Sequence, residues 1–467
     1  MASLSSGINT ALQAILAQSQ VIEVIDHNVA NASTQGYHRQ SAVLSATSSN
    51  PSMSTYFGFG ASQLGTGVTV ERIQRFTEDF FDNQYRAASA SNKSWDYQSQ
   101  ILTQMESILS DTSDGGLPSK LDQFWSAWQD LASDPTSTSY RQEVLSDSTS
   151  LTQQLNSNAQ QLLALQQSQN QSVESQVTQI NTLAKSVATL NGQISQALAA
   201  NQQPNDLLDQ RDQALDQLAE LAGAVSSTQP DGEVTVSISG HTLVTGQSAL
   251  ALQTEADPDN TAVDKIVWTN DSHTFTPNGG ELGGILKVRD EYIPQQLDAL
   301  NQIASTLITQ VNDLHSSGYT QDGSKGGQFF SGSSALDISV VDGLTPDDIA
   351  ASGSSTEDGD NSVASAIYGL SSQKLMNGDM QTINDYYNSS VTDLANIAQQ
   401  ANDNETQSSV VAQALDTQRQ SVSGVSLDEE ATNLATAQQV YQAASRVMTV
   451  INDLLGVVIN QMGVGSG

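Results

Sequence analysis

Cysteine is absent from this chain of 467 residues, and aromatic residues are scarce. Without cysteine there can be no disulfide, no thiol nucleophile and no thiolate metal site. Aromatic residues make up 5% of the chain and hydrophobic residues 37%, which is little for a globular enzyme of this length. Such a composition favours long helices in mutual contact over one thick core. We expect a mainly α protein of several domains.

Basic residues are also few, 16 against 51 acidic ones, and the net charge is −35. Phosphate binding needs a basic surface, so nucleic acid is excluded as a partner, and an anionic membrane surface is disfavoured. No apolar run reaches the length of a membrane span, which predicts no membrane insertion. The first basic residue is Arg39, so no basic region of a signal peptide precedes it. We expect a protein that is either cytoplasmic or exported without a cleaved signal.

What the chain does have is apolar residues at helical spacing near both ends. The residues predicted to make these stripes, and with them the axial contacts of a polymer, are Ile8, Ile15, Ile22, Ile25, Val29, Leu427, Leu434, Tyr441, Met448, Ile451 and Leu455. The first charge in the chain is Glu23, although a solvated helix usually spreads charges over its exposed face. The stripes can form the seam of one intramolecular coiled coil, and the uncharged opposite face favours packing against other chains as well. This indicates assembly rather than catalysis.

The predicted elements between these ends are mostly helical. After a first helix over residues 3–31 we expect a Ser- and Gly-rich loop that includes Gly58, Gly60, Gly65 and Gly67, and then further helices. These helices are expected over residues 77–110, around 121–131, over 145–198 as a coiled-coil-like helix, over 205–223, around 297–314, and over 361–377, 380–422 and 427–459, with mostly loop over 316–361. Ser426 and Glu429 match a capping box for the last helix.

Residues 224–288 change in character, because Val234–Ile238 alternates apolar and polar residues as a strand does. We predict a small β-rich inserted domain there. The layout predicts a terminal coiled-coil polymerisation domain (1–39 with 425–467) and a helical rod domain (40–223 with 289–424). The simplest arrangement is a helical rod with both chain ends at one tip and the β insert at the other.

A segment after the first helix carries a recognisable motif. The residues Asn28, Asn31, Thr34, Gly36, Tyr37 and Arg39 resemble the N-terminal signature of bacterial flagellar axial proteins, the rod, hook and hook-associated proteins. Gln35 stands where proline is common, and Gly36 keeps the position expected to need a positive φ. The closing helix from Ser426 to Val447 resembles the C-terminal partner motif of the same group, and two matching ends are more specific than one.

Two internal segments are most similar to the hook-associated protein 1 family, which joins hook to filament. They are Asn205–Asp212, and Gly280–Leu286 together with Arg289–Glu291. The resemblance implies a structural subunit of an adaptor ring in the extracellular flagellum, exported by the flagellar type III route. It implies as partners further copies of this chain, the hook protein, hook-associated protein 3 and an export chaperone on the C-terminal helix. It also implies terminal helices that order on assembly, since isolated amphipathic helices are marginally stable.

A search for catalytic chemistry returns almost nothing. The five histidines have no metal-ligand spacing, and no nucleophile elbow, phosphate loop or dinucleotide fingerprint occurs. We therefore expect no enzyme, no cofactor and no metal. The alternatives left open are another axial protein, such as hook-associated protein 3 or a flagellin-like subunit, and a secreted calcium-dependent adhesin. The β insert would be the seat of such an adhesin. The incomplete acidic loops at 257–260 and 358–361 could hold calcium, but solvated turns are the default interpretation of both.

Overall fold

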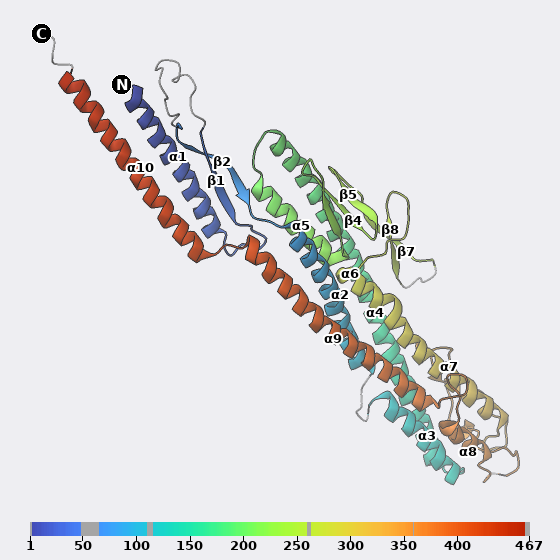
Figure 1. Ribbon diagram of the computed structural model, residues 1–467. Coiled ribbons are helices and arrows are strands. Elements are labelled where there is room, and N and C mark those ends of the chain that lie inside the picture. Colours follow the sequence, from blue (N-terminus) through green and yellow to red (C-terminus); the bar gives the residue numbers. More distant parts are fainter. Residues whose placement is uncertain (1, 48–64, 110–114, 259–262, 358, 463–467) are drawn as a thin grey trace.

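The computed structural model describes residues 2–47, 65–109, 115–258, 263–357 and 359–462. It is an elongated, mainly α molecule with both termini at one end, as expected (Figure 1). We divide it into two parts. The terminal module consists of α1 (Ala2–Ala30), β1 (Gln40–Ala46), β2 (Val68–Arg75) and α10 (Leu427–Met462). The rod comprises everything between, from α2 to α9.

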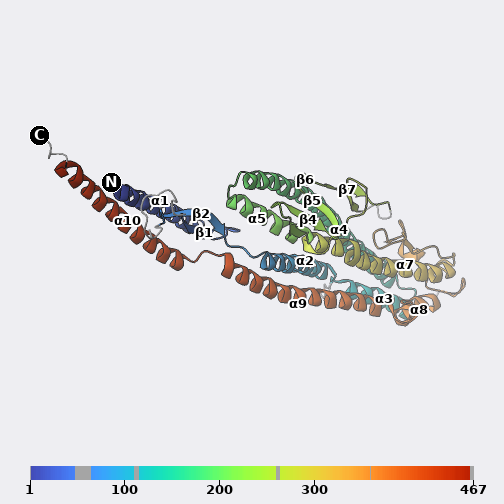
Figure 2. The ribbon, with the colours of Figure 1, turned by 45° about the horizontal axis from the view of Figure 1, so that its top comes forward.

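The described residues of the rod form eight α-helices. They are α2 (Asp79–Leu109), α3 (Leu117–Ser133), α4 (Thr138–Ala199), α5 (Asn205–Ala222), α6 (Gly280–Lys287), α7 (Ile293–Ser317), α8 (Ser362–Gly369) and α9 (Ile383–Ser423). Helices α2 and α9 pair along their length and lie against a second layer that contains α4, α5 and α7 (Figures 1 and 2). A π-helical turn, Val288–Tyr292, joins α6 to α7, and short 3₁₀ turns occur at Pro346–Asp348 and Leu370–Ser372.

The strands form small antiparallel sheets. In the terminal module β1 pairs with β2, with a bulge between Val43 and Leu44. In the rod, one sheet has the order β3-β4-β5-β6 and two pairs are β7-β8 and β9-β10. Their bounds are β3 (Val225–Thr228), β4 (Val234–Ile238), β5 (His241–Thr245), β6 (Ser248–Ala249), β7 (Leu252–Ala256), β8 (Asp264–Trp268), β9 (Phe330–Ser331) and β10 (Ser339–Val340).

Three expectations from the sequence were wrong. The segment after Tyr37, expected as loop, contains β1 and β2, although Gly58 and Gly60 lie outside the described residues. The range 224–288 ends in a helix, α6, which begins after a turn at Gly279 and Gly280 and in which Gly284 allows a close approach to α2. The strands β3 to β8 do not form the far tip but lie alongside α4 and α5, and the far tip consists of α3, α8 and the adjoining ends of their neighbours (Figure 1).

Asparagines on α4 explain why the β insert lies along the rod. The side-chain amide of Asn181 pairs with both backbone groups of Leu252 at 2.8 Å, and that of Asn191 pairs with the carbonyl (2.8 Å) and N–H (3.1 Å) of Val234. Asn170 accepts from the Asp264 N–H at 2.8 Å. These three asparagines are about three helical turns apart and share one face of α4. Each supplies the hydrogen bonds that a neighbouring strand would otherwise make, so the strand starts are fixed on α4.

Two hydrophobic cores hold the rod together. One fills the far half, around the aromatic cluster of Phe124, Trp128, Phe329 and Phe330, and the other joins α4, α5 and α6 to the insert. His315, which is fully buried, closes the far core with its ring: its Nδ1 lies 2.8 Å from the Gly327 carbonyl, and its Nε2 accepts from the Ala350 N–H at 2.9 Å. The second bond requires an unprotonated Nε2, so the ring is neutral in the fold.

We predict that His315 makes the rod less stable in mild acid. Burial lowers the pKa of His315 below its ordinary value. The unfolded chain therefore takes up the proton first, so stability is complete above about pH 6.5 and falls as the pH drops toward the folded-state pKa. The loss reaches at most about 1.4 kcal/mol per pH unit for one group. Urea unfolding followed by tryptophan fluorescence should show a steeper pH dependence for the native chain than for His315→Gln, and equal slopes would contradict the prediction.

Candidate assembly interface and joint

Helices α1 and α10 lie antiparallel and form the predicted coiled coil at the terminal end (Figure 1). Gly7 lies against Ile451 near the tip, and Asn28 contacts Glu430 at the other end. The segment from Gly7 to Asn28 on α1 is as long as the segment from Glu430 to Ile451 on α10, so the two helices stay in register along the whole contact. The terminal module thus pairs the two ends of the chain with each other.

The predicted axial residues divide into two groups in this pair. Ile25 is buried, and Ile8, Ile15, Ile22, Leu434, Met448, Ile451 and Leu455 are half-buried. In contrast, Val29, Leu427 and Tyr441 are 43%, 57% and 38% exposed. The predicted stripe on α10 therefore serves mainly the intramolecular pair.

A second apolar row on α10, missed in the sequence, faces away from the molecule. We call it the outer seam, and it consists of Val440, Ala443, Val447, Val450, Leu454 and Val457. Their spacing alternates three and four residues, as the core positions of a coiled coil do. The large side chains of the outer seam are 42–57% exposed. One window of 18 residues within Ile383–Ile459 even has a mean hydropathy of 1.2, enough by length and composition to cross a membrane, and is 6% buried.

The motif residue Asn28 is the hub of the terminal module. Its Nδ2 donates to the Gln40 carbonyl at 2.8 Å and to Glu430 Oε2 at 3.1 Å. Its Oδ1 accepts from the Tyr37 hydroxyl at 2.8 Å and from the Gln40 N–H at 2.9 Å. Asn28 is 1% exposed, so all four bonds are made away from water. Only an amide offers two donors and two acceptors in so small a side chain.

The other motif residues shape the turn after α1. Asn31 Nδ2 donates to the His27 carbonyl, and its Oδ1 accepts from the Thr34 hydroxyl at 3.2 Å. Gly36 has φ 78°, the positive value that its position predicted. Arg39 pairs with Glu429 at 2.7 Å, and its guanidinium lies 4.4 Å from the centre of the Phe76 ring.

Because Glu429 is engaged by Arg39, the predicted capping box at α10 is only half formed. Ser426 Oγ accepts from the Glu429 N–H at 3.5 Å, while the Glu429 carboxylate points to the turn. The start of α10 is therefore fixed to the axial motif by an ion pair rather than by its own cap.

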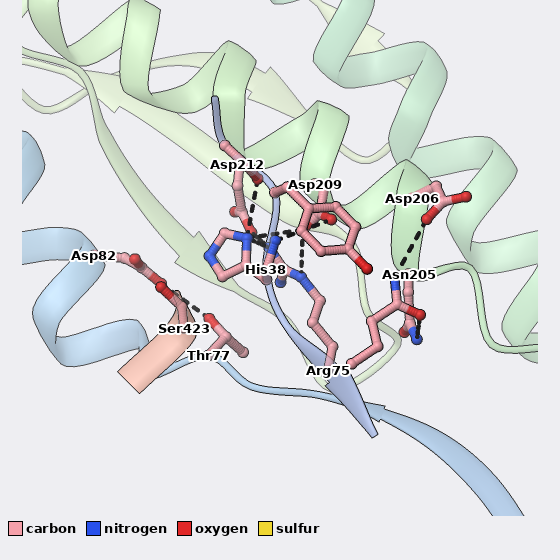
Figure 3. Close-up of polar contacts among 12 residues, drawn as sticks. His38, Arg75, Thr77, Asp82, Asn205, Asp206, Asp209, Asp212 and Ser423 are labelled. Carbon is pink, nitrogen blue, oxygen red and sulfur yellow. Dashed lines mark hydrogen bonds and ion pairs between the residues drawn. The ribbon is translucent and has the colours of Figure 1, made fainter. Parts of the chain in front are cut away.

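The two family-like motifs meet at the joint between terminal module and rod. Helix α5 carries a stripe of carboxylates one turn apart, Asp206, Asp209, Asp212 and Asp216, which we call the α5 stripe. His38 of the axial turn has its Nδ1 2.8 Å from Asp209 Oδ1 (Figure 3). Arg75 of β2 donates to Asp209 at 2.7 Å and to Asp212 at 2.5 Å. The diagnostic segment Asn205–Asp212 is thus the docking surface for the axial motif.

Two arginines of the rod form ion pairs with the C-terminal carboxylates of the α5 stripe, Asp212 and Asp216. Arg86 of α2 pairs with Asp212 at 3.2 Å and with Asp216 at 2.6 Å, and Arg419 of α9 pairs with Asp216 at 2.7 Å. Burial raises the pKa of Asp212, but Arg75 and Arg86 outweigh it, and the pKa lies below its usual value. Burial likewise lowers the pKa of Arg75, and Asp212 and Asp209 raise it above normal. Asp212 and Arg75 therefore stay charged near neutral pH.

A polar hollow of about 610 Å³ lies between the axial turn and the end of α9. Arg39 and Arg419 line it, but both are already paired with carboxylates. Among the described residues no group of three or more acidic or histidine side chains is placed to hold a metal ion. The loops 257–260 and 358–361 fall partly outside the described residues, at 259–260 and at 358.

Two family models match this chain, one in the rod and one mainly in the terminal module. A family model described as "Flagellar hook-associated protein FlgK helical domain" matches residues 102–330. A second, "Flagellar basal body rod FlgEFG protein C-terminal", matches residues 417–462, which contain the end of α9 and all of α10. The first therefore matches most of the rod and the second the C-terminal part of the coiled coil.

Curated relatives match over their whole length. The chain is 30% identical to "Flagellar hook-associated protein 1" of Bacillus subtilis (strain 168), with 100% of both chains covered. It is 28% identical to the protein of that name from Salmonella typhimurium and 27% to that from Escherichia coli (strain K12), each with 98% of this chain and 100% of the relative covered. The solved structure of "the flagellar hook junction protein FlgK from Burkholderia pseudomallei" has the same fold, with TM-score 0.67 and 19% identity over 73% of this chain and all of that one.

Proposed function

The chain belongs to the flagellar hook-associated protein 1 family, and we propose that its terminal module builds an adaptor ring between hook and filament. The protein is a structural component of the bacterial flagellum and acts at the hook–filament junction. The observation that supports the ring is the outer seam, an apolar coiled-coil row on α10 that has no partner within the described residues of one copy. A coiled-coil row of this length is buried when a second helix covers it.

Further copies of this chain are the partners that best fit the outer seam. Near it the charged residues are few, Arg446 and Asp453, whereas nearly all of the net charge of −35 belongs to residues 40–424. Copies that meet through α10 therefore avoid most of the repulsion between their rods. The sequence predicts a terminal module of residues 1–39 and 425–467. The hairpin β1-β2 belongs to this module as well, since both strands pack on α1.

The other assignments rest on family membership. The ring contacts the hook protein on one side and hook-associated protein 3 on the other, and an export chaperone covers α10 before assembly. The protein reaches the extracellular flagellum by the flagellar type III route without signal cleavage. It is not an enzyme, and it inserts into no membrane. The rod (79–423), with residues 224–288 along its side, projects away from the ring.

Charging the outer seam tests this function. We expect Val447→Glu with Val450→Glu to abolish self-assembly, because each buried carboxylate without a partner is strongly unfavourable. The matched control adds the same charge beside the seam, Gln442→Glu with Asn452→Asp, at exposed positions. Light scattering of concentrated protein and circular dichroism of dilute protein separate assembly from folding. Assembly by the seam variant at the native level would contradict the proposal.

A complementation assay distinguishes the alternatives. In bacteria that lack their junction protein, the native chain and the control variant should restore filament attachment, and the seam variant should not. Restoration only in bacteria that lack hook-associated protein 3 or flagellin would favour those assignments instead.

A further inference from the structure

The terminal module and the rod have separate hydrophobic interiors. Neither of the two core clusters includes a described residue of α1, β1, β2 or α10. The module's buried apolar residues are its own: Ala11, Ala17, Val24, Ile25 and Ala437. Apolar packing is what normally fixes two bodies relative to each other, so their relative orientation must be held in another way.

The chain crosses between the two bodies at two neighbouring places. One crossing is Phe76–Glu78, between β2 and α2, and the other is Gly424–Ser426, between α9 and α10. They are held side by side through Arg39, whose N–H donates to the Ser423 carbonyl at 2.8 Å and whose carbonyl accepts from the Phe76 N–H at 2.9 Å. Two short connections in one place allow a rotation without breaking either body, which is the geometry of a hinge.

Beside this hinge, hydrogen bonds and ion pairs link the module to α5 of the rod. Asn205 donates to the Ile73 carbonyl at 3.1 Å, and Gln40 reaches Asp206 at 3.4 Å. His38 Nδ1 lies 2.8 Å from both Asp209 and Arg75, and one nitrogen cannot donate to the first and accept from the second at once. Arg75 therefore spans two carboxylates of the α5 stripe from the side of the module, as Arg86 does from the side of the rod with Asp212 and Asp216.

The ion pairs of Arg75 are well shielded from water. Its side chain is 7% exposed, and those of Asp209 and Asp212 are 11% and 18% exposed. The planar guanidinium holds two carboxylates in fixed directions, which a flexible ammonium cannot do. Removal of one partner from such a buried pair is strongly unfavourable, so the module has one preferred position on the rod.

We propose that Arg75 is a positioning residue: it latches the terminal module to the α5 stripe and so sets the orientation of the α1–α10 coiled coil relative to the rod. Asp212 completes the latch, because it receives Arg75 from the module and Arg86 from the rod. The latch matters for assembly only if the proposed ring function holds, since the ring fixes where each coiled coil must point. The orientation itself belongs to the single copy.

The experiment compares Arg75→Met with Arg72→Met in the full chain at monomer concentration. Arg72 lies on the same strand, but its side chain is 46% exposed and pairs with the adjacent, exposed Glu71. Because the chain has no cysteine, Asn433→Cys on α10 and Thr189→Cys on α4 give two unique sites for spin labels, both exposed. The interspin distance then reports the angle between the two bodies.

We expect one narrow distance distribution for the native sequence and for Arg72→Met. Arg75→Met should broaden it by about twofold or more, as a released hinge samples other angles. Arg75→Lys should give an intermediate width. Amide protection of α10 and tryptophan fluorescence should not change, because each body keeps its own core.

Two results in the variants would overturn the latch, and so would a broad distribution in the native chain, which would show that the terminal helices order only on assembly, as the resemblance to the axial proteins implies. One is an equally narrow distribution in Arg75→Met, which would show that other contacts set the angle. The other is loss of amide protection in α10, which would place Arg75 in the stability of the module rather than in its orientation. Failure of the native chain to assemble at high concentration would contradict the ring function and leave the latch measurement valid, since that measurement uses single copies.

Discussion

Replacement of Asn28 by leucine is expected to lower the free energy of unfolding of the terminal module by about 3–9 kcal/mol, while the rod keeps its stability. Leucine is close to asparagine in size but offers no hydrogen bond. The Gln40 N–H and carbonyl and Glu430 would each lose a buried partner. An unsatisfied buried polar group costs about 1–3 kcal/mol, and three of them give the stated range.

The two parts of the molecule can be followed separately during urea unfolding. All four tryptophans, Trp95, Trp125, Trp128 and Trp268, belong to the rod, so their fluorescence reports the rod alone. Circular dichroism also records α1 and α10. In Asn28→Leu the helical signal should fall at a lower urea concentration than in the native chain, while the fluorescence transition stays in place.

The control for this substitution is Asn9→Leu, on the exposed side of the same helix. It makes the same chemical change without removing a buried partner, so we expect little effect on either transition. If Asn9→Leu and Asn28→Leu shift the circular dichroism equally, the loss is one of helix solubility or propensity, and the hub role of Asn28 is wrong.

The long helices could be predicted from the sequence because their signals are local. The spacing of apolar residues placed the end of α4 within one residue, although the helix begins seven residues before the predicted start, and Gly36 predicted a positive φ that the structure has. The nesting of chain ends around the middle also predicted that α1 and α10 pair. These conclusions need only periodicity and turn chemistry, which act over a few residues.

The hairpin β1-β2 escaped prediction because its evidence is not local. Its strands are separated by residues 47–67, rich in serine and glycine, and a bulge leaves Glu71 of β2 unmatched opposite the step from Val43 to Leu44, which interrupts the alternation of side chains. Helix α1 packs on both strands and stabilises this pair. Contacts supplied by a distant element override local propensity in such cases.

The joint between the terminal module and the rod could not be predicted from the sequence either. Residues 205–212 are an ordinary acidic helix start when taken alone, and the spacing of Asp206, Asp209, Asp212 and Asp216 was the available signal for a one-sided stripe. Nothing in the sequence says that Arg75 and His38 face it, because that depends on how the module sits on the rod. The outer seam, by contrast, was readable: its row follows the inner stripe one position earlier along α10.

Two adjacent glycines in α6, Gly283 and Gly284, are expected to respond in opposite ways to replacement by alanine. An added Cβ at Gly284 would lie 2.6 Å from the Ser94 carbonyl oxygen and 3.3 Å from Tyr97 Cβ, so α2 and α6 would have to separate. An added Cβ at Gly283 would meet Pro277 at 3.8 Å, an ordinary contact. Both residues are helical, and alanine is preferred to glycine in a helix by about 1 kcal/mol.

We therefore expect opposite signs from the same change one residue apart. Gly283→Ala should leave the rod unchanged or stabilise it by up to about 1 kcal/mol. Gly284→Ala should destabilise it by about 2–3 kcal/mol, because a strain term of overpacking exceeds the gain in helix propensity. Urea midpoints from tryptophan fluorescence measure both. Equal shifts of the urea midpoint in the two variants would contradict this prediction, because they would mean that α2 and α6 can separate freely. The close approach of these helices would then not explain the glycines of the Gly280–Leu286 segment.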